Sequence, residues 1–191
     1  PAYKHKEIIA KMARASEKLN ILINDIFLSL QLKENLAFNP ELIDLKELIE
    51  DLYNQTLKPN YEKRGLVLNL QDSDSVEINS DKFYLTIALQ KLLDNAEKYS
   101  LSGQVDIDIA EKDNYAIIEI RDSGIGLTDE EKPKIFNKFF RGIKAKEIWQ
   151  DGSGLGLNIT KEIIEALGGE ISAESEGRSR GSRFIVKLPI G

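Results

Sequence analysis

Apolar residues near the N-terminus recur in steps of four and three. The repeating positions are Ile8, Met12, Ala15, Leu19, Leu22 and Ile26, and Ile9, Ile23, Phe27 and Leu30 widen the same stripe. This spacing is typical of the seam of a coiled coil or a helix bundle. It predicts one long helix over residues 5–32, and the wide stripe suits a four-helix bundle better than a two-stranded coil. The alternative is a core helix docked on its own domain.

The pattern changes to shorter elements after this helix. Residues 35–40, which end in Pro40, predict a connector. Asp44-Leu45-Lys46-Glu47 has the form of a capping box, so the apolar face behind it predicts a helix that ends near Gly65. The next predicted elements are short strands at 66–70 and 76–78 around a polar loop over 71–75, and a helix over about 81–99 that Ser80 caps.

Two hairpins are predicted in the second half of the chain, where strand-like runs flank short turn sequences. Their strands lie at 104–109 with 115–121, around Asp113-Asn114, and at 170–176 with 183–189, around residues 177–181. A helix over 158–167 precedes the second hairpin. Strands in hairpins with helices on one side predict an α+β fold, a two-layer sandwich of a mixed sheet with helices on one face, preceded by the long stem helix.

A charged segment over residues 127–153 lies between the two hairpins. It opens with a second capping-box pattern, Thr128 to Glu131, and Pro133 keeps the helix there short. Residues 137–151 have no firm period. With few apolar residues to hold it down, we expect this segment to be a mobile lid.

Composition excludes several classes of protein. The 191 residues carry a net charge of −6 and no basic block, so no nucleic-acid partner is expected. With no cysteine and His5 as the only histidine, disulfides, thiolate metal sites and histidine-based zinc sites are not expected. No apolar run has the length of a membrane span, and we expect a cytoplasmic location for this chain. Because it begins with Pro1, we interpret it as a fragment whose parent protein is open to membrane anchoring.

The motif Asp122-Ser123-Gly124-Ile125-Gly126 follows a strand-like run. Glycine permits positive φ and has no Cβ to clash with a ligand, so the backbone can approach one closely. The carboxylate can accept a hydrogen bond from an exocyclic amine such as that of adenine. The alternative is an ordinary turn at the end of a strand.

A second glycine motif, Gly152-Ser153-Gly154-Leu155-Gly156-Leu157, leads directly into a predicted helix. Free N–H groups and the helix dipole make such a junction a site for anions, including phosphates. No GxxxxGK[ST] run exists, which excludes a P-loop. Leu157 stands where a dinucleotide-binding loop needs its third glycine, which excludes that class.

Taken in order, four motifs resemble the boxes of sensor histidine kinases, in the ATPase superfamily shared with gyrase, MutL and the heat-shock chaperones. They are Asn95 with Lys98 and Tyr99, Asp122-x-Gly124-x-Gly126, Phe136-Asn-Lys-Phe139-Phe140-Arg141, and Gly152-x-Gly154-x-Gly156. The resemblance covers about residues 1–190. It implies a catalytic domain that binds Mg-ATP and transfers the γ-phosphoryl group to a histidine on the stem, for relay to a response regulator receiver domain.

The resemblance also implies two domains and a homodimer. Residues 1–36 would be one helix of the dimerisation and phosphotransfer stem, and residues 37–191 the catalytic ATP-binding domain. The first stem helix, with the acceptor histidine, is expected upstream of Pro1. His5 is followed by Lys6 and Glu7 rather than by an acidic partner, so we interpret it as a solvated surface histidine.

The resemblance and the chemistry of the side chains assign the site. Asn95 offers an amide oxygen to Mg²⁺, shared with phosphate, and Asp122 accepts from the adenine amine. Lys98 and Arg141 are the expected catalytic cations because they can neutralise the transferring phosphoryl group. The remaining nucleotide-binding residues are Tyr99, Gly124, Ile125, Gly126, Phe139, Gly152, Ser153, Gly154, Leu155, Gly156, Leu157 and, beside Gly181 in the last glycine box, Ser182.

Lys91 departs from the family pattern, which usually has asparagine one turn before the metal asparagine. It could contact phosphate directly or weaken Mg²⁺ binding. It motivates an alternative, a non-catalytic ATP-binding scaffold. A further alternative is an ATP-driven dimeric clamp. The apolar stripe of the helix over residues 5–32 and the phenylalanines Phe136, Phe139 and Phe140 of the predicted lid argue against it.

Overall fold

The computed structural model describes residues 2–32, 38–70, 75–100 and 103–191. The chain divides into two compact units, residues 1–36 and 37–191. The described part of the first unit is the helix α1 (Ala2–Gln31), which confirms the predicted long helix. Much of its apolar stripe is exposed to solvent, namely Ile8, Ile9, Met12, Leu19, Ile23, Ile26, Phe27 and Leu30. Residues 35–37 of the predicted connector, and residues 71–74 of the loop predicted over 71–75, lie outside the described residues.

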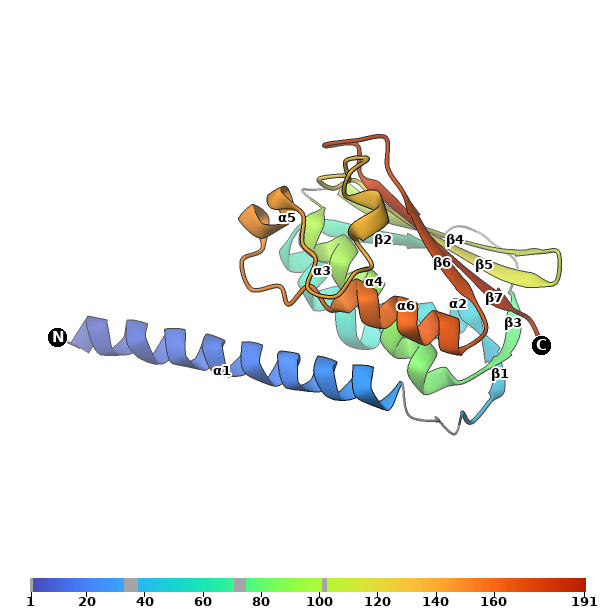
Figure 1. Ribbon diagram of the computed structural model, residues 1–191, viewed down its shortest axis with the longest axis horizontal. Helices are drawn as coiled ribbons and strands as arrows, with labels where there is room; N and C mark the ends of the chain where they lie inside the picture. Colours follow the sequence, from blue (N-terminus) through green and yellow to red (C-terminus); the bar gives the residue numbers. More distant parts are fainter. Residues whose placement is uncertain (1, 33–37, 71–74, 101–102) are drawn as a thin grey trace. The chain divides into compact units, whose positions relative to one another are not determined.

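The second unit is built on a five-stranded mixed sheet (Figure 1). Its strands, in spatial order, are β2 (Leu66–Leu70), β4 (Gly103–Lys112), β5 (Tyr115–Asp122), β7 (Ser182–Pro189) and β6 (Glu170–Glu174). β2 runs parallel to β4 and the other neighbours are antiparallel. Asp113 and Asn114 both have positive φ, 53° and 64°, as a tight hairpin turn requires. The two predicted hairpins are the antiparallel pairs β4–β5 and β6–β7.

A separate two-stranded sheet was not predicted. Its strands are β1 (Glu41–Asp44) and β3 (Glu77–Ser80), which run antiparallel. Ile43 lies opposite Ile78, and both side chains are buried. The strand predicted at 76–78 is β3, shifted by a residue or two, while the four residues of β1 are too few for a pattern of alternation to stand out.

Two helices of the second unit, α2 and α4, begin at an aspartate that accepts hydrogen bonds from free backbone N–H groups. Asp44 Oδ1 accepts from the backbone N–H of Lys46 and Glu47, as the capping-box pattern predicts, and starts α2 (Leu45–Leu52). The predicted single helix continues through a π-helical turn (Tyr53–Leu57) into α3 (Lys58–Lys63). Ser80 was predicted to cap α4 (Lys82–Tyr99), but it is still in β3, and Asp81 caps the helix by accepting from Tyr84 N–H at 3.1 Å.

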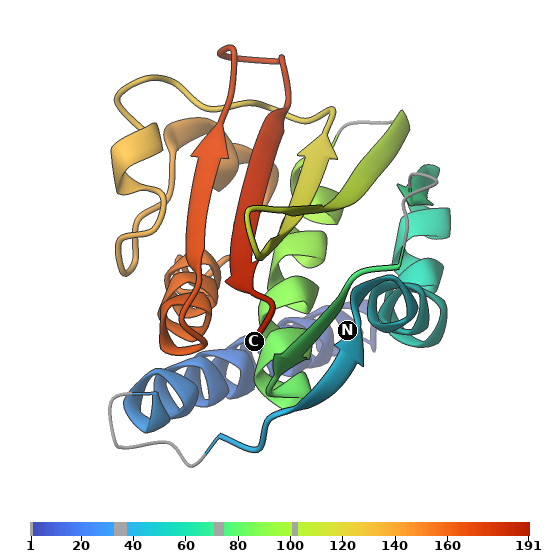
Figure 2. The same cartoon turned by 90° about the vertical axis from the view of Figure 1, so that its right-hand side faces the viewer.

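Helices cover one face of the large sheet (Figures 1 and 2). The core between α4, α6 (Gly156–Ala166) and the sheet consists of fully buried aliphatic side chains, among them Leu85, Leu89, Leu92, Ile107, Ile118, Ile120, Ile159, Ile163 and Val186. Along β5, Ala116, Ile118 and Ile120 face the helices, while Ile117, Glu119 and Arg121 alternate to the other face. This arrangement confirms the predicted α+β two-layer fold.

Candidate functional site

Asp122 ends β5 and is held by two backbone amides. Its Oδ1 accepts from Gly124 N–H at 2.8 Å and from Ser182 N–H at 3.2 Å. Burial raises the pKa of the Asp122 carboxyl to about 6, and the two amides act in the opposite direction. Among the residues that the structure describes, none donates a hydrogen bond to Oδ2. The second oxygen is therefore available as an acceptor.

The end of β5 is joined to the end of α4 and to the β6–β7 hairpin loop. Ile125 N–H donates to the Tyr99 carbonyl at 3.2 Å, and Gly181 N–H donates to the Gly124 carbonyl at 3.1 Å. Five of the residues expected at the nucleotide are brought together here, Tyr99, Asp122, Gly124, Ile125 and Ser182.

The glycines of the first motif have a packing reason that the sequence did not reveal. A Cβ on Gly124 would lie 2.3 Å from the Tyr99 carbonyl oxygen, and one on Gly126, where φ is 65°, would lie 1.9 Å from the Gly177 carbonyl oxygen. These positions require glycine before any ligand is considered.

The three glycines of the second motif differ in what surrounds them. A Cβ on Gly154, where φ is 73°, would lie 2.8 Å from the Phe139 carbonyl carbon, and one on Gly152 would lie 3.0 Å from the Arg141 guanidinium carbon. Gly156 instead has no described atom within 4 Å of its would-be Cβ. Packing against the backbone explains Gly154, while Gly152 meets only the end of the Arg141 side chain and Gly156 faces open space at the first turn of α6.

The N-terminus of α6 is available to an anion. No described side chain caps this end, and the Ser153 hydroxyl accepts from Leu155 N–H at 3.1 Å just ahead of the first turn. Leu155 is buried and fixes the start of the helix, while Gly156 and Leu157 are only half-buried. Free N–H groups beside open space can donate hydrogen bonds to phosphate oxygens, so the first turn of α6 fits the phosphates of a nucleoside triphosphate.

One face of α4 carries Asp94, Asn95 and Lys98. Lys98 Nζ lies 4.0 Å from Asp94 Oδ2. Burial raises the pKa of the Asp94 carboxyl, and the positive charges of Lys98 and Lys91 oppose the rise. Within the described ranges, no group of three or more His, Cys, Asp or Glu side chains could hold a metal ion. The amide oxygen of Asn95 therefore fits Mg²⁺ only if phosphate oxygens share the ion.

Arg141 organises the lid segment. Its guanidinium donates to the backbone carbonyls of Ala145 at 3.1 Å, Gln150 at 3.3 Å and Gly152 at 3.0 Å, and also to that of Trp149. These bonds enclose α5 (Ile143–Ile148), a short helix that the sequence did not predict. The cation expected at the phosphate is thus occupied inside the lid in this structure.

Phe136, Phe139 and Phe140, which the sequence suggests as anchors of the lid, differ in burial: Phe136 and Phe140 are half-buried and Phe139 is exposed. The Phe139 side chain is 64% exposed, and its backbone, at φ 61°, donates N–H to the Gly154 carbonyl at 2.9 Å. The Phe136 carbonyl accepts from Asn158 Nδ2 at 3.1 Å, which ties the lid to α6. Hydrogen bonds to the backbone of Phe136 and Phe139 therefore hold this part of the lid, and the Phe139 ring does not.

Trp149 and Ser175 were missed by sequence reasoning. The Trp149 ring lies 6.0 Å from Lys98 Nζ, so the lid reaches the α4 face. The Ser175 hydroxyl accepts from Leu127 N–H at 3.0 Å and donates to the Gly181 carbonyl at 2.6 Å, which links the start of the lid to the last glycine box. A lone tryptophan in an aperiodic segment and a serine at a strand end are weak signals in a single sequence.

A surface depression of about 580 Å³ reaches this junction. Its lining includes Asp122, Ser182 and four cationic side chains, Arg121, Lys132, Arg180 and Arg183.

A family model described as "Histidine kinase-, DNA gyrase B-, and HSP90-like ATPase" matches residues 80–191, which is more than half of the chain. The chain belongs to this ATPase family. The match begins at Ser80 and so contains α4, the Asp122 motif, the lid and the α6 glycines.

Proteins similar to this chain include histidine kinases. Sensor histidine kinase WalK of Bacillus subtilis (strain 168) is 34% identical over 201 residues, which cover 98% of this chain and 32% of WalK. Histidine kinase AdeS of Acinetobacter baumannii has a TM-score of 0.74 and 28% identity over 92% of this chain and 80% of that one. Full-length ShkA in complex with AMPPNP has a TM-score of 0.82 over 97% of this chain and 39% of that one, and at 21% identity shows the fold alone.

The chain spans about a third of the length of the curated relatives that it matches. No helix among the described residues is both long and apolar enough to cross a membrane.

Proposed function

We propose that this chain is the catalytic ATP-binding part of a sensor histidine kinase, attached to one helix of its dimerisation stem. The observation that carries the proposal is the pairing of two prepared sites in one domain. Asp122 presents an acceptor without a partner among the described residues, and the uncapped first turn of α6 presents free N–H donors beside Gly156. An adenine amine and a chain of phosphates fit these two sites in chemistry.

In this proposal each residue has one task. Asp122 Oδ2 accepts from the adenine amine, and the backbone at Gly124, Ile125 and Gly126 passes beside the base and ribose. The amides from Gly152 to Leu157 hold the phosphates, and Ser182 and Tyr99 fix the base end. Bound Mg²⁺ would neutralise phosphate charge, with Asn95 supplying its one protein ligand.

Lys98 and Arg141 are the proposed catalytic cations. Catalysis of phosphoryl transfer rests on positioning and charge neutralisation rather than on covalent chemistry by the protein. Lys98 lies next to Asn95 on α4 and would exchange Asp94 and Trp149 for phosphate oxygens. Arg141 would have to release lid carbonyls before it could reach the phosphate, so its task requires the lid to rearrange.

The helix α1 supports the proposals about dimerisation and about the acceptor histidine. The exposed apolar stripe of α1 is a surface that burial against other helices would stabilise, which favours a homodimer through the stem helices in the intact protein. The acceptor histidine would lie on the partner helix of that stem, and a response regulator receiver domain would take the phosphoryl group from it. Such a relay is cytoplasmic, where ATP is available.

The test is transfer of label from γ-labelled ATP. The chain is incubated with a separate stem helix that carries a histidine followed by an acidic residue, and with the same helix in which alanine replaces the histidine. Acid-labile, alkali-stable label on the first helix only supports the kinase. Free phosphate without labelled helix would favour the dimeric clamp instead.

A second candidate, an ATP-binding scaffold without transfer, rests on Lys91. This lysine lies one turn before Asn95 on α4 and acts electrostatically on Asp94. A second cation there could replace a metal contact and weaken Mg²⁺ binding. Nucleotide binding without transfer, with transfer restored by Lys91→Asn, would support the scaffold.

A further inference from the structure

Two arginines lie directly opposite each other, one near the end of β5 and the other near the start of β7. In the antiparallel register Arg121 is paired with Arg183, on the face of the sheet opposite α4 and α6. Like charges directly opposite each other on neighbouring strands repel and destabilise the pair. The next pair along these strands is Asp122 with Ser182, which contains the proposed adenine acceptor.

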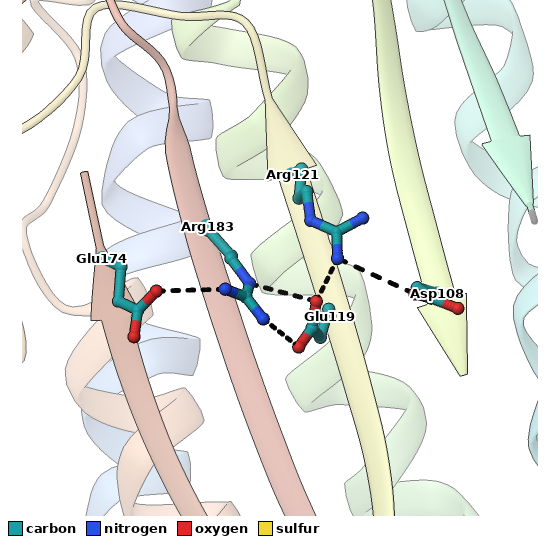
Figure 3. A network of polar contacts seen from close by, with 5 residues as sticks. All are labelled: Asp108, Glu119, Arg121, Glu174 and Arg183. Carbon is teal, nitrogen blue, oxygen red and sulfur yellow. Dashed lines mark hydrogen bonds and ion pairs between the residues drawn. The ribbon is translucent and has the colours of Figure 1, made fainter. Parts of the chain in front are cut away.

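Glu119 lies between the two arginines (Figure 3). Arg183 Nε donates to Glu119 Oε2 at 3.0 Å, a second Arg183 nitrogen reaches Oε1, and Arg121 also bonds to Oε2. Asp108 and Glu174 extend the network at its two ends, 3.7 Å from Arg121 and 3.2 Å from Arg183. The arginines, Arg183 foremost, hold the pKa of the Glu119 carboxyl below its usual range, so the bridge is charged at neutral pH.

Glu119 and Asp122 are connected through the backbone. The Glu119 carboxylate ties β7 to β5 at Arg183, and the preceding residue of β7, Ser182, donates its N–H to Asp122 Oδ1. Because the two pairs are adjacent, repulsion that moves β5 and β7 apart at Arg121 and Arg183 would also lengthen the hydrogen bond from Ser182 N–H to Asp122 Oδ1. Because Gly124 and Ser182 together orient Oδ1, they determine where Oδ2 points.

We propose that Glu119 is a positioning residue for base recognition: by neutralising the facing Arg121 and Arg183, it keeps Ser182 N–H on Asp122 and so aims Oδ2 at the exocyclic amine of adenine. This inference rests on the proposed ATP site. Glu119 itself touches no nucleotide, and its contribution is to base selectivity rather than to phosphate binding.

The test variant is Glu119→Gln, which keeps the size of the side chain and removes its charge. Affinities for ATP and for inosine triphosphate are measured by calorimetry. Inosine has a carbonyl oxygen where adenosine has the amine, so it repels a correctly aimed carboxylate. We expect Glu119→Gln to lower the ATP-to-inosine preference by about threefold to tenfold, the usual size of one coupling within a charged network.

Two further measurements separate positioning from general loss of stability. Without nucleotide, the Ser182 amide proton should move upfield in the NMR spectrum of Glu119→Gln as its hydrogen bond lengthens. The pH midpoint of ATP binding should move to higher pH, since the Ser182 amide lowers the pKa of the Asp122 carboxyl. Glu119→Gln/Arg121→Gln removes the repulsion and should recover most of the preference.

Lys187→Gln is the matched control. Lys187 lies on the same face of β7, at the far end of the β5–β7 pair, where its Nζ is 4.0 Å from the centre of the Tyr115 ring. It should leave base preference unchanged.

Three results would overturn the inference: equal loss of affinity for both nucleotides in Glu119→Gln, an unmoved Ser182 amide, or no recovery in the double variant. If the unsubstituted chain binds neither nucleotide, the proposed function fails, and the Ser182 amide still reports on the network.

Discussion

Replacing Asp122 with asparagine should raise the stability of the protein while it weakens nucleotide binding. In the folded protein the carboxyl is buried and its pKa is raised from 3.8 to about 6, so at neutral pH a charge is held where solvation is poor. Asparagine has the same shape, and its Oδ1 can still accept from Gly124 and Ser182. Its Nδ2, however, presents a donor to the donor amine of adenine.

The magnitude follows from the pKa change. The pKa of Asp122 rises from 3.8 to about 6 on folding, so at neutral pH the charged carboxylate lowers the free energy of unfolding by about 3 kcal/mol. Asp122→Asn recovers at most this amount, because the buried amide must also be desolvated. For ATP, loss of one hydrogen bond and a donor–donor contact should weaken binding by about 1–3 kcal/mol.

The pH dependence has a definite sign. A folded pKa above the unfolded value means that the Asp122 contribution favours folding below about pH 4 and is lost as the pH rises through about 6. The gain from Asp122→Asn should therefore be full above pH 6 and absent below pH 4. Tyr61 on α3 interacts electrostatically with Asp122, but burial raises the pKa of its phenol, so it stays neutral over this range.

Denaturant unfolding of both chains at pH 4, 5, 6 and 7, with calorimetric titration of ATP at pH 7, measures the two effects. Equal stabilisation at pH 4 and pH 7 would show that the charge of Asp122 is not its cause. Unchanged ATP affinity would remove Asp122 from the nucleotide site.

Four further predictions concern the rest of the site. Asn95→Ala should keep metal-free nucleotide binding and lose the gain from Mg²⁺ in calorimetry; full Mg²⁺ dependence would contradict the metal assignment. Residues 127–153 should exchange amide hydrogens quickly without ATP and slowly with it, and strong protection in the empty protein would refute a mobile lid. Because Trp149 is the only tryptophan and lies over Lys98, Lys98→Met should shift its fluorescence without nucleotide; an unchanged spectrum would argue against this contact. The chain alone should gain no acid-labile phosphate from labelled ATP, and label that vanishes in His5→Ala would make His5 an acceptor.

Much of the fold follows from local patterns in the sequence. The heptad-like stripe predicts α1, and the alternating runs around Asp113-Asn114 predict β4 and β5, because each pattern is long and its turn is chemically specific. β1 and α5 were missed because both are short. β1 forms through its pairing with β3, and α5 is held by hydrogen bonds from the Arg141 side chain to backbone carbonyls such as that of Ala145. Long-range contacts of this kind leave no local pattern.

The site divides in the same way. Each glycine motif has a local physical reason, but it was the order of the motifs and their resemblance to sensor histidine kinases that led us to propose Asp122 and the α6 glycines as parts of one site. The sequence did not reveal that Gly124 and Gly126 are required by packing against backbone oxygens. Nor did it reveal the contacts of Glu119 with Arg121 and Arg183, since cross-strand pairs depend on register between strands 60 residues apart, the separation of Asp122 and Ser182.

A crystal structure of the chain with Mg²⁺ and a non-hydrolysable ATP analogue would show where the nucleotide binds. We expect the adenine amine on Asp122 Oδ2, phosphate oxygens on the amides of the first turn of α6, and Mg²⁺ between those oxygens and Asn95. A nucleotide bound elsewhere, or one whose base leaves Asp122 Oδ2 without a partner, would contradict this expectation.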